Sequence, residues 1–467
     1  MKKKTSKKKM LPAKEKLFGT DGIRGTPGVY PLTEGMIVKI ARAIADFVVS
    51  AKKNGKTKIV IGKDTRTSGD QIENILAHTI CVSGVDVYLA GTITTPGLSF
   101  MVKTLSCDMG IMISASHNKA ADNGIKLFNS DGLKLSPKEE EYIEDDIFCN
   151  LGPSHCATVF VQPRPKGDIK KVKNTCEKYI QFLSSTLQGT DLKGVKIALD
   201  CAWGAASPFA KKLFRKLGAK VDSIHDTPSG ENINEGGAVH PALLRELVLS
   251  SKSDIGVAVD GDGDRGIVID ETGHILDGDC IIAIIANHWL EKDKLPQKAV
   301  VGTVMSNYGL KVALERHGCK LICTSVGDKH VIEALIKHRL VLGGEQSGHI
   351  IFMEHLPAPD GLLTALQIIK IMKETGLPLS ALAKTFSRYP QTLINIKVKE
   401  KKPFDEIPSL SAKVRECNSR LKDEGRILLR YSGTETLARV MVEGKQKDLV
   451  ESIAGDLASI IKEDIGI

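Results

Sequence analysis

The hydrophobic residues of this chain form short runs that recur between polar loops and longer stretches with helical spacing. Short, continuously apolar runs are typical of strands buried on both faces, and their alternation with helices predicts α/β domains with largely parallel sheets. Three such blocks follow one another. The predicted strands are residues 58–62, 85–90 and 110–113 in the first block, 195–199, 219–224 and 255–259 in the second, and 299–304, 320–324 and 340–343 in the third.

The pattern changes after about residue 385. Residues 392–399 alternate between apolar and polar positions, and residues 426–430 and 438–442 follow with a glycine turn between them before a helical pattern from Asp448. A period of two with one polar face predicts an antiparallel sheet in a small α+β domain. We therefore expect three consecutive α/β domains with mixed, largely parallel sheets and a smaller C-terminal α+β domain, arranged around a central cleft.

Domain boundaries are expected where the composition changes. The Pro-Arg-Pro-Lys-Gly stretch at 163–167 marks the end of the first block, and the other boundaries fall near 273 and 385. The expected units are a tail at 1–16 and domains at 17–160, 165–273, 274–385 and 386–467. Within the first domain, Ser136 followed by Pro137 and Glu139 predicts a helix that starts with a capping box.

The net charge of +9 is concentrated at the N-terminus. Residues 1–16 hold eight lysines and one glutamate, so they contribute +7 and leave only +2 for the rest of the chain. A run of like charges cannot bury itself, which predicts a disordered, solvated arm. Aromatic residues make up only 4% of the chain, so a surface that stacks nucleic-acid bases is not expected and nucleic acid is not a required partner.

Neither a membrane segment nor a disulfide framework is predicted. The apolar run at 280–287 is too short to span a bilayer and is interpreted as a buried helix. The ten cysteines lack paired spacing and no signal peptide is recognised, so reduced thiols in the cytoplasm are expected. Cys319 and Cys323, near His317, have the wrong spacing for a zinc site.

The most informative segment for chemistry is residues 110–128, in which Ser116 and His117 leave a predicted buried strand on a polar loop. The carboxyl edge of a parallel sheet opens onto a ligand crevice, so Ser116 is a candidate nucleophile there. A hydroxyl needs a base, a metal or prior phosphorylation to react at neutral pH. Lys126 lies ten residues further on, in Asn-Gly-Ile-Lys.

Asp260, Asp262 and Asp264 alternate with glycines directly after another predicted strand. An all-oxygen donor set suits Mg²⁺ better than Zn²⁺, and without a cation three such carboxylates would repel one another. A calcium EF-hand is the sharpest alternative, but it requires glycine where Arg265 stands and two flanking helices. A purely structural turn is the other alternative. We predict a magnesium site, with Arg265 as its positive neighbour.

Three further loops carry candidate binding groups. Glu345, Ser347 and His349 stand between glycines and suit the hydroxyls of a sugar, although a glycine-rich turn with a surface histidine is the alternative. The groups at 430–439 suit a phosphate cradle or, alternatively, a hairpin turn with a surface arginine. Arg24 lies in a glycine-rich loop that is equally typical of an N-terminal turn. The cradle residues are Arg430, Ser432, Gly433, Thr434 and Arg439.

These segments together resemble the phosphohexomutase superfamily, most closely its bacterial phosphoglucosamine mutase branch, over nearly the entire chain. The usual pattern has proline where Lys119 stands, and proline or asparagine where Thr436 stands. Neither change removes a catalytic group. The segments that carry the resemblance, in the family's order, are GTDGIRG at 19–25, SASHN at 114–118, DGDGDR at 260–265, GGEQSGH at 343–349 and RYSGTE at 430–435.

The resemblance implies roles for the residues. Ser116 would carry a phosphoryl group and, with the three aspartates, would bind one Mg²⁺. Arg24 and Lys126 would face the transferring phosphoryl group, with the segment from Asp64 to Arg66 in the same cleft. The positive groups, Arg66 included, would neutralise the charge of that phosphoryl group. Glu345 and Ser347 would contact sugar hydroxyls, with Arg265 and His349 beside them, and the loop at 430–434 would hold the phosphate that does not react. For the general base, Lys126 acting with His117 is preferred over His349.

The implied activity is the interconversion of glucosamine 6-phosphate and glucosamine 1-phosphate through a 1,6-bisphosphate, which would feed UDP-N-acetylglucosamine and cell-wall precursor synthesis. Gln346, in place of methionine, favours this branch. Ser116 would be charged by a hexose 1,6-bisphosphate or another phosphoryl donor, and the protein would act as a monomer or homodimer. The alternatives are a phosphomannomutase/phosphoglucomutase, a non-catalytic phosphosugar-binding protein and a metal phosphatase.

Overall fold

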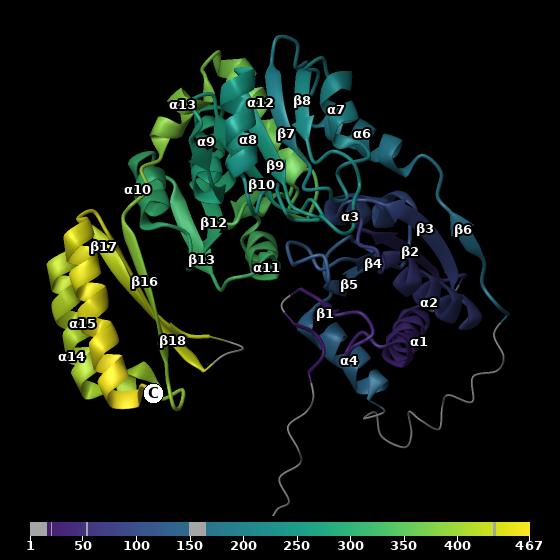
Figure 1. Ribbon diagram of the computed structural model, residues 1–467, viewed down its shortest axis with the longest axis horizontal. Coiled ribbons are helices and arrows are strands. Elements are labelled where there is room, and N and C mark those ends of the chain that lie inside the picture. Colours follow the sequence, from purple (N-terminus) through teal and green to yellow (C-terminus); the bar gives the residue numbers. More distant parts are fainter. Residues whose placement is uncertain (1–15, 20, 53–54, 149–164, 433–435) are drawn as a thin grey trace, which may run out of the picture.

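The computed structural model describes residues 16–19, 21–52, 55–148, 165–432 and 436–467 of the chain. The domains follow one another around an arc, from the purple and blue first domain through teal and green to the yellow C-terminal domain (Figure 1). The three α/β domains and the smaller C-terminal sheet domain confirm the predicted fold class. Most of the predicted tail at 1–16 and residues 163–164 of the predicted boundary lie outside the described residues.

The first domain is built on a six-stranded sheet. Its elements are β1 (Ile23–Gly25), α1 (Glu34–Ala51), β2 (Lys58–Lys63), α2 (Gly69–Val82), β3 (Asp86–Thr92), α3 (Thr95–Thr104), β4 (Met109–Ile113), β5 (Asn123–Asn129), α4 (Pro137–Ile147) and β6 (Ile169–Lys171). The strand order is β1-β5-β4-β2-β3-β6. Strands β4, β2, β3 and β6 are parallel, whereas β5 is antiparallel to both of its neighbours, β4 and β1.

Local sequence signals explain how the helices of this domain begin and pack. Ser136 and Glu139 form the predicted capping box at the start of α4. Helix α1 buries Ile37, Ile40 and Ile44, which are spaced by three and four residues and therefore share one face against the sheet. Helical periodicity thus decides which face of α1 enters the core.

Strand β6 differs from the sequence prediction. Residues 169–171 were expected in the second domain, which was predicted to start at 165, but Val87 to Leu89 of β3 pair with Ile169 to Lys171. The pairing makes β6 an edge strand of the first sheet. All three β6 residues are exposed, so its sequence offers no apolar pattern from which this pairing could be recognised.

The second and third domains each have a smaller mixed sheet. The second contains α6 (Thr175–Ser185), β7 (Lys196–Asp200), α7 (Ala210–Lys216), β8 (Lys220–Ile224), α8 (Ala242–Ser251), β9 (Ile255–Val259), β10 (Gly266–Asp270) and β11 (Ile275–Leu276). The third contains α9 (Gly278–Glu291), β12 (Ala299–Thr303), α10 (Tyr308–Arg316), β13 (Lys320–Thr324), α11 (Asp328–His338), β14 (Leu342–Gly344), β15 (Ile350–Phe352), α12 (Gly361–Thr375) and α13 (Leu379–Leu382).

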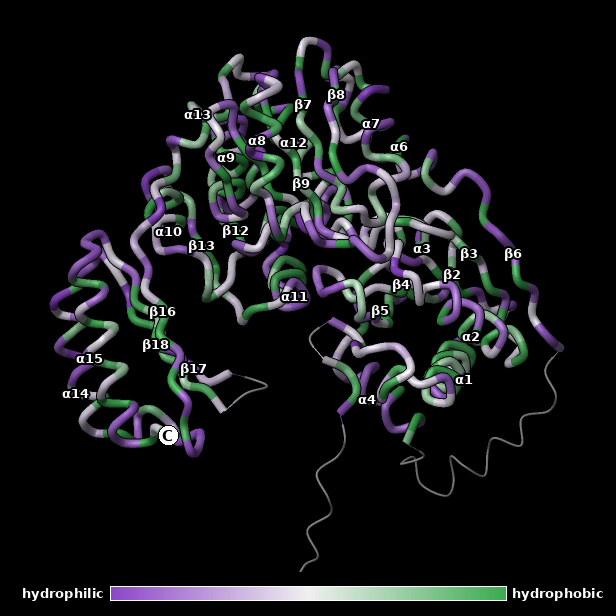
Figure 2. The backbone as a smooth tube through the Cα atoms, viewed as in Figure 1, coloured by the Kyte–Doolittle hydropathy of each residue, from purple (hydrophilic) through white to green (hydrophobic). Residues whose placement is uncertain are grey.

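The two sheets have the strand orders β11-β10-β9-β7-β8 and β13-β12-β14-β15. In each, the parallel strands were predicted, whereas the antiparallel strands β10, β11 and β15 were not. One hydrophobic cluster runs through both domains, from Tyr179 on α6 through α9 to Leu379 on α13. Helix α9, which corresponds to the apolar run at 280–287, is almost entirely buried in this cluster. Figure 2 shows the hydrophobic colour concentrated in this region.

The C-terminal domain has its own core. Its elements are β16 (Gln391–Lys397), α14 (Pro408–Leu421), β17 (Gly425–Tyr431), β18 (Leu437–Gly444) and α15 (Lys447–Ile465). The sheet order β16-β18-β17 is fully antiparallel, as predicted. Helices α14 and α15 bury one face each against the sheet, and hydrophilic and hydrophobic positions alternate along both (Figure 2). Among the described residues, no helix is long and apolar enough to cross a membrane.

Candidate active site

Ser116 lies on the loop that joins β4 to β5, at the end of a strand buried along its whole length. Its backbone has a φ of 53°, in the left-handed region that serine seldom adopts, and its side chain is buried. The Ser116 amide donates to Ser114 Oγ over 2.9 Å, and Ser114 Oγ donates to Asp64 Oδ2 over 2.7 Å. The loop that carries the Ser116 hydroxyl is therefore held in place by hydrogen bonds to Ser114 and Asp64.

Arg66 braces this loop. Its guanidinium donates to the carbonyl oxygens of Ser116 and Asn118, each over 2.9 Å, and to those of Lys119 and Asp122. Arg66 also pairs with Asp64 and is buried. These contacts use its hydrogen-bond donors on protein atoms, so the expectation that Arg66 neutralises a phosphoryl group in transfer is wrong for this arrangement. Its role is to fix the backbone beneath the nucleophile.

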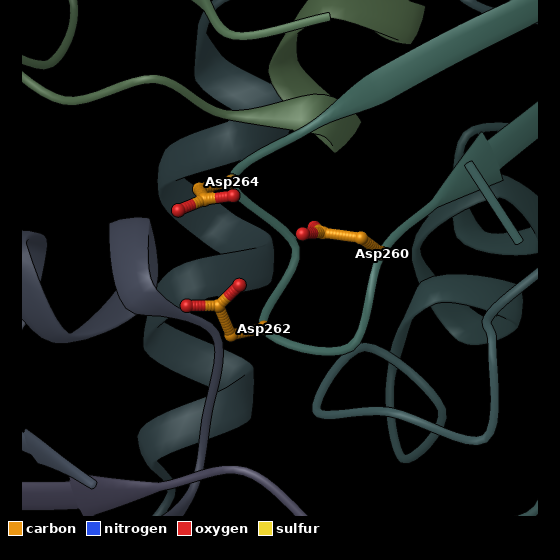
Figure 3. Close-up of side chains that lie close together, drawn as sticks. All are labelled: Asp260, Asp262 and Asp264. Atoms are coloured by element: carbon orange, nitrogen blue, oxygen red, sulfur yellow. The ribbon is translucent and has the colours of Figure 1, made fainter. Parts of the chain in front are cut away.

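Asp260, Asp262 and Asp264 lie on the loop between β9 and β10, and their carboxylates point toward one another (Figure 3). One oxygen from each lies within 4.8 Å of the others, and all three side chains are buried. Burial, reinforced by the charges of Asp264 and Asp262, raises the pKa of Asp260 to about 8. Asp262 Oδ1 is buried without a hydrogen-bond partner. A hard cation bound by the three carboxylates would satisfy this atom and offset the repulsion.

The triad is connected to the serine loop by direct contacts. Ser116 Oγ lies 3.1 Å from Asp260 Oδ2. Lys126 Nζ, from β5, lies 2.8 Å from Asp262 Oδ2 and 2.9 Å from Asp21 Oδ2. Burial opposes the charged form of Lys126, but the carboxylates of Asp21, Asp262 and Asp264 outweigh this effect and raise its pKa well above the usual value. Lys126 is thus an ammonium group beside the nucleophile.

Two residues that sequence reasoning missed join the first domain to the metal loop. Asn234 Nδ2 donates to the carbonyl oxygens of Ser116 and Asn118, and Asn234 Oδ1 accepts from the Gly261 amide over 2.8 Å. Thr95, at the start of α3, donates from its hydroxyl and its amide to Asp262. Neither residue lies in a recognisable motif. Only the packing of the domains reveals that Asn234 bridges the serine and metal loops and that Thr95 joins α3 to the metal loop.

The sugar loop, residues 343–349, meets the metal loop through His349. His349 Nδ1 lies 2.9 Å from Glu345 Oε2, and Nε2 lies 3.1 Å from Asp264 Oδ1. Burial alone would lower the pKa of His349, but these two carboxylates raise it to about 10. Arg265 lies against the same ring, with its Nε 3.1 Å from His349 Nε2. Glu345 also accepts from the Gly327 amide, whereas the Ser347 side chain is exposed.

His117 has the opposite electrostatic character. Its Nδ1 lies 3.4 Å from Ser116 Oγ. Burial, together with the positive charges of Arg265 and Arg24, lowers its pKa to about 4, so the imidazole is neutral at pH 7. Lys126 and His349, the two residues first considered as general bases, are both held in their protonated forms by carboxylates. Of these three residues, His117 is the one that has a neutral ring and contacts Ser116 Oγ.

Arg24 lies on β1, which pairs with β5, and contacts the serine loop at Asn118. Its guanidinium donates to Asn118 Oδ1 over 3.2 Å and pairs with Asp21. The glycine at 124, directly opposite Arg24 on β5, is needed because a Cβ there would lie 2.6 Å from the Ser114 carbonyl oxygen. The structure thus places the serine, metal and sugar loops and Arg24 in one contact network.

The phosphate loop of the C-terminal domain is not part of this network in the portion of the chain that the structure describes. Arg430 on β17 and Arg439 on β18 stand directly opposite each other, and burial together with the neighbouring Arg439 charge lowers the pKa of Arg430. Like charges at opposed positions favour binding of an anion between them. Ser432 lies at the end of β17, whereas Gly433 and Thr434 lie outside the described residues.

Comparison with known proteins gives matches along nearly the whole chain. The matched families are described as phosphoglucomutase/phosphomannomutase alpha/beta/alpha domains I, II and III and C-terminal domain, over residues 15–151, 177–273, 277–389 and 393–460. The chain belongs to the phosphoglucomutase/phosphomannomutase family. As a phosphohexomutase of this family, it is an isomerase that transfers a phosphoryl group.

Relatives within this family are similar over their full length. The phosphoglucosamine mutase of Chlamydia abortus is 43% identical over 459 residues, covering 97% of this chain and 98% of the relative. That of Geobacter metallireducens is 44% identical over 456 residues, covering 97% and 99%. Both relatives support the sequence-based assignment to this branch of the phosphohexomutases.

Solved phosphohexomutase structures share the fold. A Burkholderia thailandensis phosphoglucomutase/phosphomannomutase family protein has a TM-score of 0.79 at 22% identity and covers 97% of this chain and 99% of its own. The Aspergillus fumigatus N-acetylphosphoglucosamine mutase, solved in complex with GlcNAc-6P and magnesium, has a TM-score of 0.66 at 19% identity and covers 97% and 96%. At these identities the likeness concerns the four-domain architecture.

Proposed function

We propose that the protein interconverts glucosamine 6-phosphate and glucosamine 1-phosphate through a phosphoserine at Ser116 and a 1,6-bisphosphate intermediate. The observation that carries the proposal is the placement of Ser116 Oγ 3.1 Å from Asp260 in a buried triad of carboxylates, with Lys126 against the same triad. The full-length relatives named phosphoglucosamine mutase support glucosamine as the sugar.

The cation proposed for the triad is Mg²⁺. Asp260, Asp262, Asp264 and the Ser116 oxygen would hold it, because all four offer the oxygen donors that hard cations prefer. Asp262 Oδ1 is buried without a hydrogen-bond partner, which supports a cation at this position. When bound, the ion would supply positive charge that offsets the phosphoserine and stabilises the serine oxygen as leaving group and nucleophile.

In the forward reaction, the O1 oxygen of glucosamine 6-phosphate attacks the phosphorus of phosphorylated Ser116. The bond between phosphorus and Ser116 Oγ breaks as the bond to O1 forms, which yields the 1,6-bisphosphate and a free serine. Lys126 and Arg24 both pair with Asp21 next to the serine loop, and we assign them to the equatorial phosphoryl oxygens. The reverse transfer follows after the bisphosphate turns around, so that its 6-phosphoryl group returns to Ser116.

We assign His117 as the residue that accepts a proton and then returns it in each of the two transfers. Its neutral Nδ1 lies 3.4 Å from Ser116 Oγ, so it can take the proton of the attacking sugar hydroxyl and return it to the serine oxygen. In the second transfer the serine gives its proton to His117, and the proton ends on O6 of the product. Each half-reaction therefore balances without loss of a proton to solvent.

The remaining loops would bind the substrate. Glu345 and Ser347, with His349 and Arg265 beside them, are assigned to the sugar and its nearby phosphate oxygens. Arg430 and Arg439, with Ser432, Gly433 and Thr434 of the same loop, are assigned to the phosphate that does not react. Holding the substrate by both ends places the reacting oxygen near Ser116, which is how binding energy lowers the barrier to transfer.

A cytoplasmic enzyme acting as a monomer or homodimer, with no requirement for nucleic acid, fits this function, and its product would feed UDP-N-acetylglucosamine and cell-wall precursor synthesis. The decisive experiment is a side-by-side assay of the purified protein with glucosamine 6-phosphate, glucose 1-phosphate and mannose 1-phosphate in the presence of Mg²⁺ and a catalytic amount of hexose 1,6-bisphosphate. The expected result is the highest kcat/KM with glucosamine 6-phosphate. A preference for glucose or mannose phosphates would overturn the assignment of the sugar.

A further inference from the structure

The side chain of Gln346, the residue that favours the glucosamine branch, contacts the start of α9. Gln346 Nε2 donates to Asp279 Oδ2 over 3.2 Å, and the Gln346 carbonyl accepts from the Gly278 amide over 3.0 Å. Glycine is needed at 278 because a Cβ there would lie 2.0 Å from the Glu345 carbonyl oxygen. The first residues of α9 are therefore locked directly beneath the sugar loop.

Asp279 contacts both Gln346 and Asn307. The Asn307 amide donates to the same Asp279 Oδ2 over 2.8 Å. Both side chains are completely buried, and Asn307 Oδ1 caps α10 by accepting from the Gly309 amide. A buried carboxylate that loses one donor is costly, because no water replaces it. The positions of Gln346 and Asn307 are consequently linked through one carboxylate oxygen.

Asn307 in turn holds the C-terminal domain. Its Nδ2 lies 3.1 Å from Glu443 Oε1 on β18 and also donates to the Tyr389 carbonyl oxygen, and its Oδ1 accepts from the Tyr389 amide, in the connector to that domain. Glu443 Oε2 also accepts from Arg426 Nε over 2.7 Å and from the Tyr308 amide over 3.2 Å. Glu443 is fully buried, so this contact is a fixed attachment point between the third and fourth domains.

Glu443, the attachment point, and the phosphate-binding pair Arg430 and Arg439 all lie on the paired strands β17 and β18. Arg426 pairs with Glu443, and four residues further along the two strands Arg430 pairs with Arg439. An even separation puts the two pairs on the same face of the sheet, and four residues of strand span about 13 Å. A rotation of the fourth domain about Glu443 would therefore displace the guanidiniums of Arg430 and Arg439.

We propose that Gln346, Asp279, Asn307 and Glu443 form a buried relay that couples the sugar loop to the orientation of the fourth domain, so that sugar contact at Glu345 favours the orientation in which Arg430 and Arg439 grip the distal phosphate. These four are positioning residues, since none of them touches a reacting atom. The inference rests on the proposed function for its substrate. An apolar side chain at 346 has no donor for Asp279 and interrupts the relay at its first step.

The relay is tested with Gln346→Leu, Glu443→Gln and the double variant. Lys445→Gln is the matched control, because Lys445 lies two residues from Glu443 and its side chain is exposed and pairs only with Glu424 of the same domain among the described contacts. Each single relay variant is expected to raise KM for glucosamine 6-phosphate about threefold to tenfold, to lower kcat less, and to increase the free 1,6-bisphosphate released per turnover. The KM of the double variant is expected to be no higher than that of the poorer single variant, because both substitutions interrupt the same set of contacts.

Backbone hydrogen exchange at residues 386–391 provides a readout that needs no turnover. Glucosamine 6-phosphate is expected to slow exchange of this connector in the wild type and in Lys445→Gln but not in Gln346→Leu. Additive effects of the two relay substitutions on KM, or equal protection of the connector in Gln346→Leu and the wild type, would overturn the relay. Protection of the connector in a wild-type protein without mutase activity would instead overturn the proposed function and leave the relay standing.

Discussion

Ser116 Oγ and Asp260 Oδ2 lie 3.1 Å apart, although 144 positions of sequence separate the two residues. The serine belongs to the first domain and the aspartate to the second. The contact therefore forms only when the two domains are docked, and it joins the nucleophile to the carboxylate triad.

Ser116 is expected to carry the phosphoryl group in the resting enzyme. Intact-mass analysis of freshly purified protein should find one phosphate, which peptide mapping should assign to Ser116. Ser116→Ala should lack this phosphate and lose mutase activity by a factor of at least about 10³, because the covalent intermediate cannot form. Ser114→Ala is a useful comparison, since it removes the hydroxyl that supports the loop but leaves the nucleophile. Full activity in Ser116→Ala would show that the covalent mechanism is wrong.

Metal dependence should follow from the triad. Chelation should abolish activity, and Mg²⁺ should restore it more effectively than Zn²⁺, because the candidate donors are all oxygens. Asp260→Asn should lower kcat by about 10² or more, since it replaces a carboxylate donor of the proposed cation with an amide beside Ser116 Oγ. Titration calorimetry should show weaker Mg²⁺ binding by this variant than by the wild type. Unchanged affinity in Asp260→Asn would place the ion elsewhere.

Asn234 should matter although it is far from any motif. Asn234→Ala removes the bridge from the Ser116 and Asn118 carbonyl oxygens to the Gly261 amide, and each buried group left unpaired costs about 1–3 kcal/mol. We expect kcat to fall about tenfold or more, with a smaller change in KM. Asn232→Ala is the control, because its side chain contacts only nearby Ser229 and Glu235 among the described contacts. Equal kinetics for the two variants would contradict the bridging role.

Asp360 should make stability depend on pH. It caps α12 by accepting from the amides of Leu362 and Leu363 and pairs with the Tyr179 hydroxyl, and burial raises its pKa to about 6. The folded state thus holds the proton more tightly than the unfolded state, so this contribution to stability is present below about pH 4 and is lost as the pH rises to about 6.

Asp360→Asn cannot ionise. Relative to the wild type, its free energy of unfolding should therefore increase between pH 4 and pH 7, by up to about 2–3 kcal/mol. Denaturant unfolding of both proteins at several pH values would measure the difference. A constant difference across this interval would show that Asp360 does not titrate there.

Arg430 should be a clamp for the phosphate that takes no part in bond making. Arg430→Ala should raise KM for the monophosphate about tenfold, and free 1,6-bisphosphate should escape more often during its turnaround. Escape leaves Ser116 without its phosphoryl group, so added bisphosphate should partly restore activity. Arg430→Lys keeps the charge, so its KM should lie between the KM of the wild type and that of Arg430→Ala. A normal KM with no response to bisphosphate would show that Arg430 is an ordinary residue of a hairpin.

The sequence predicted the parts of the fold that depend on local pattern. The apolar runs located the parallel strands, and the capping box located the start of α4. The same approach found Ser116 and the three aspartates, because the chemistry of each segment is visible in its own residues. It missed β6, which is short and exposed, and it missed the antiparallel strands β10, β11 and β15, whose pairing depends on the rest of the sheet.

Contacts between distant segments could not be predicted in the same way. Arg66 was expected to face the phosphoryl group, but its donors are taken by backbone carbonyls of the serine loop. Asn234 and Thr95 are ordinary polar residues in sequence and become bridges only through domain docking. Lys126 and His349 were considered as bases because their residue types permit it. Their carboxylate neighbours, which come from other loops, keep both protonated.

The continuous hydrophobic cluster from Tyr179 to Leu379 means that the second and third domains do not correspond to two independent modules. A cut near residue 273 would expose the apolar faces of α6, α9 and α12 together, so neither half should be recovered as a well-behaved fragment. By contrast, the C-terminal domain closes its own core over β16, β18 and β17. Gene fragmentation or domain exchange between relatives should therefore succeed at the connector near 386–391 and fail within the shared cluster, where any exchange must move both α/β domains together.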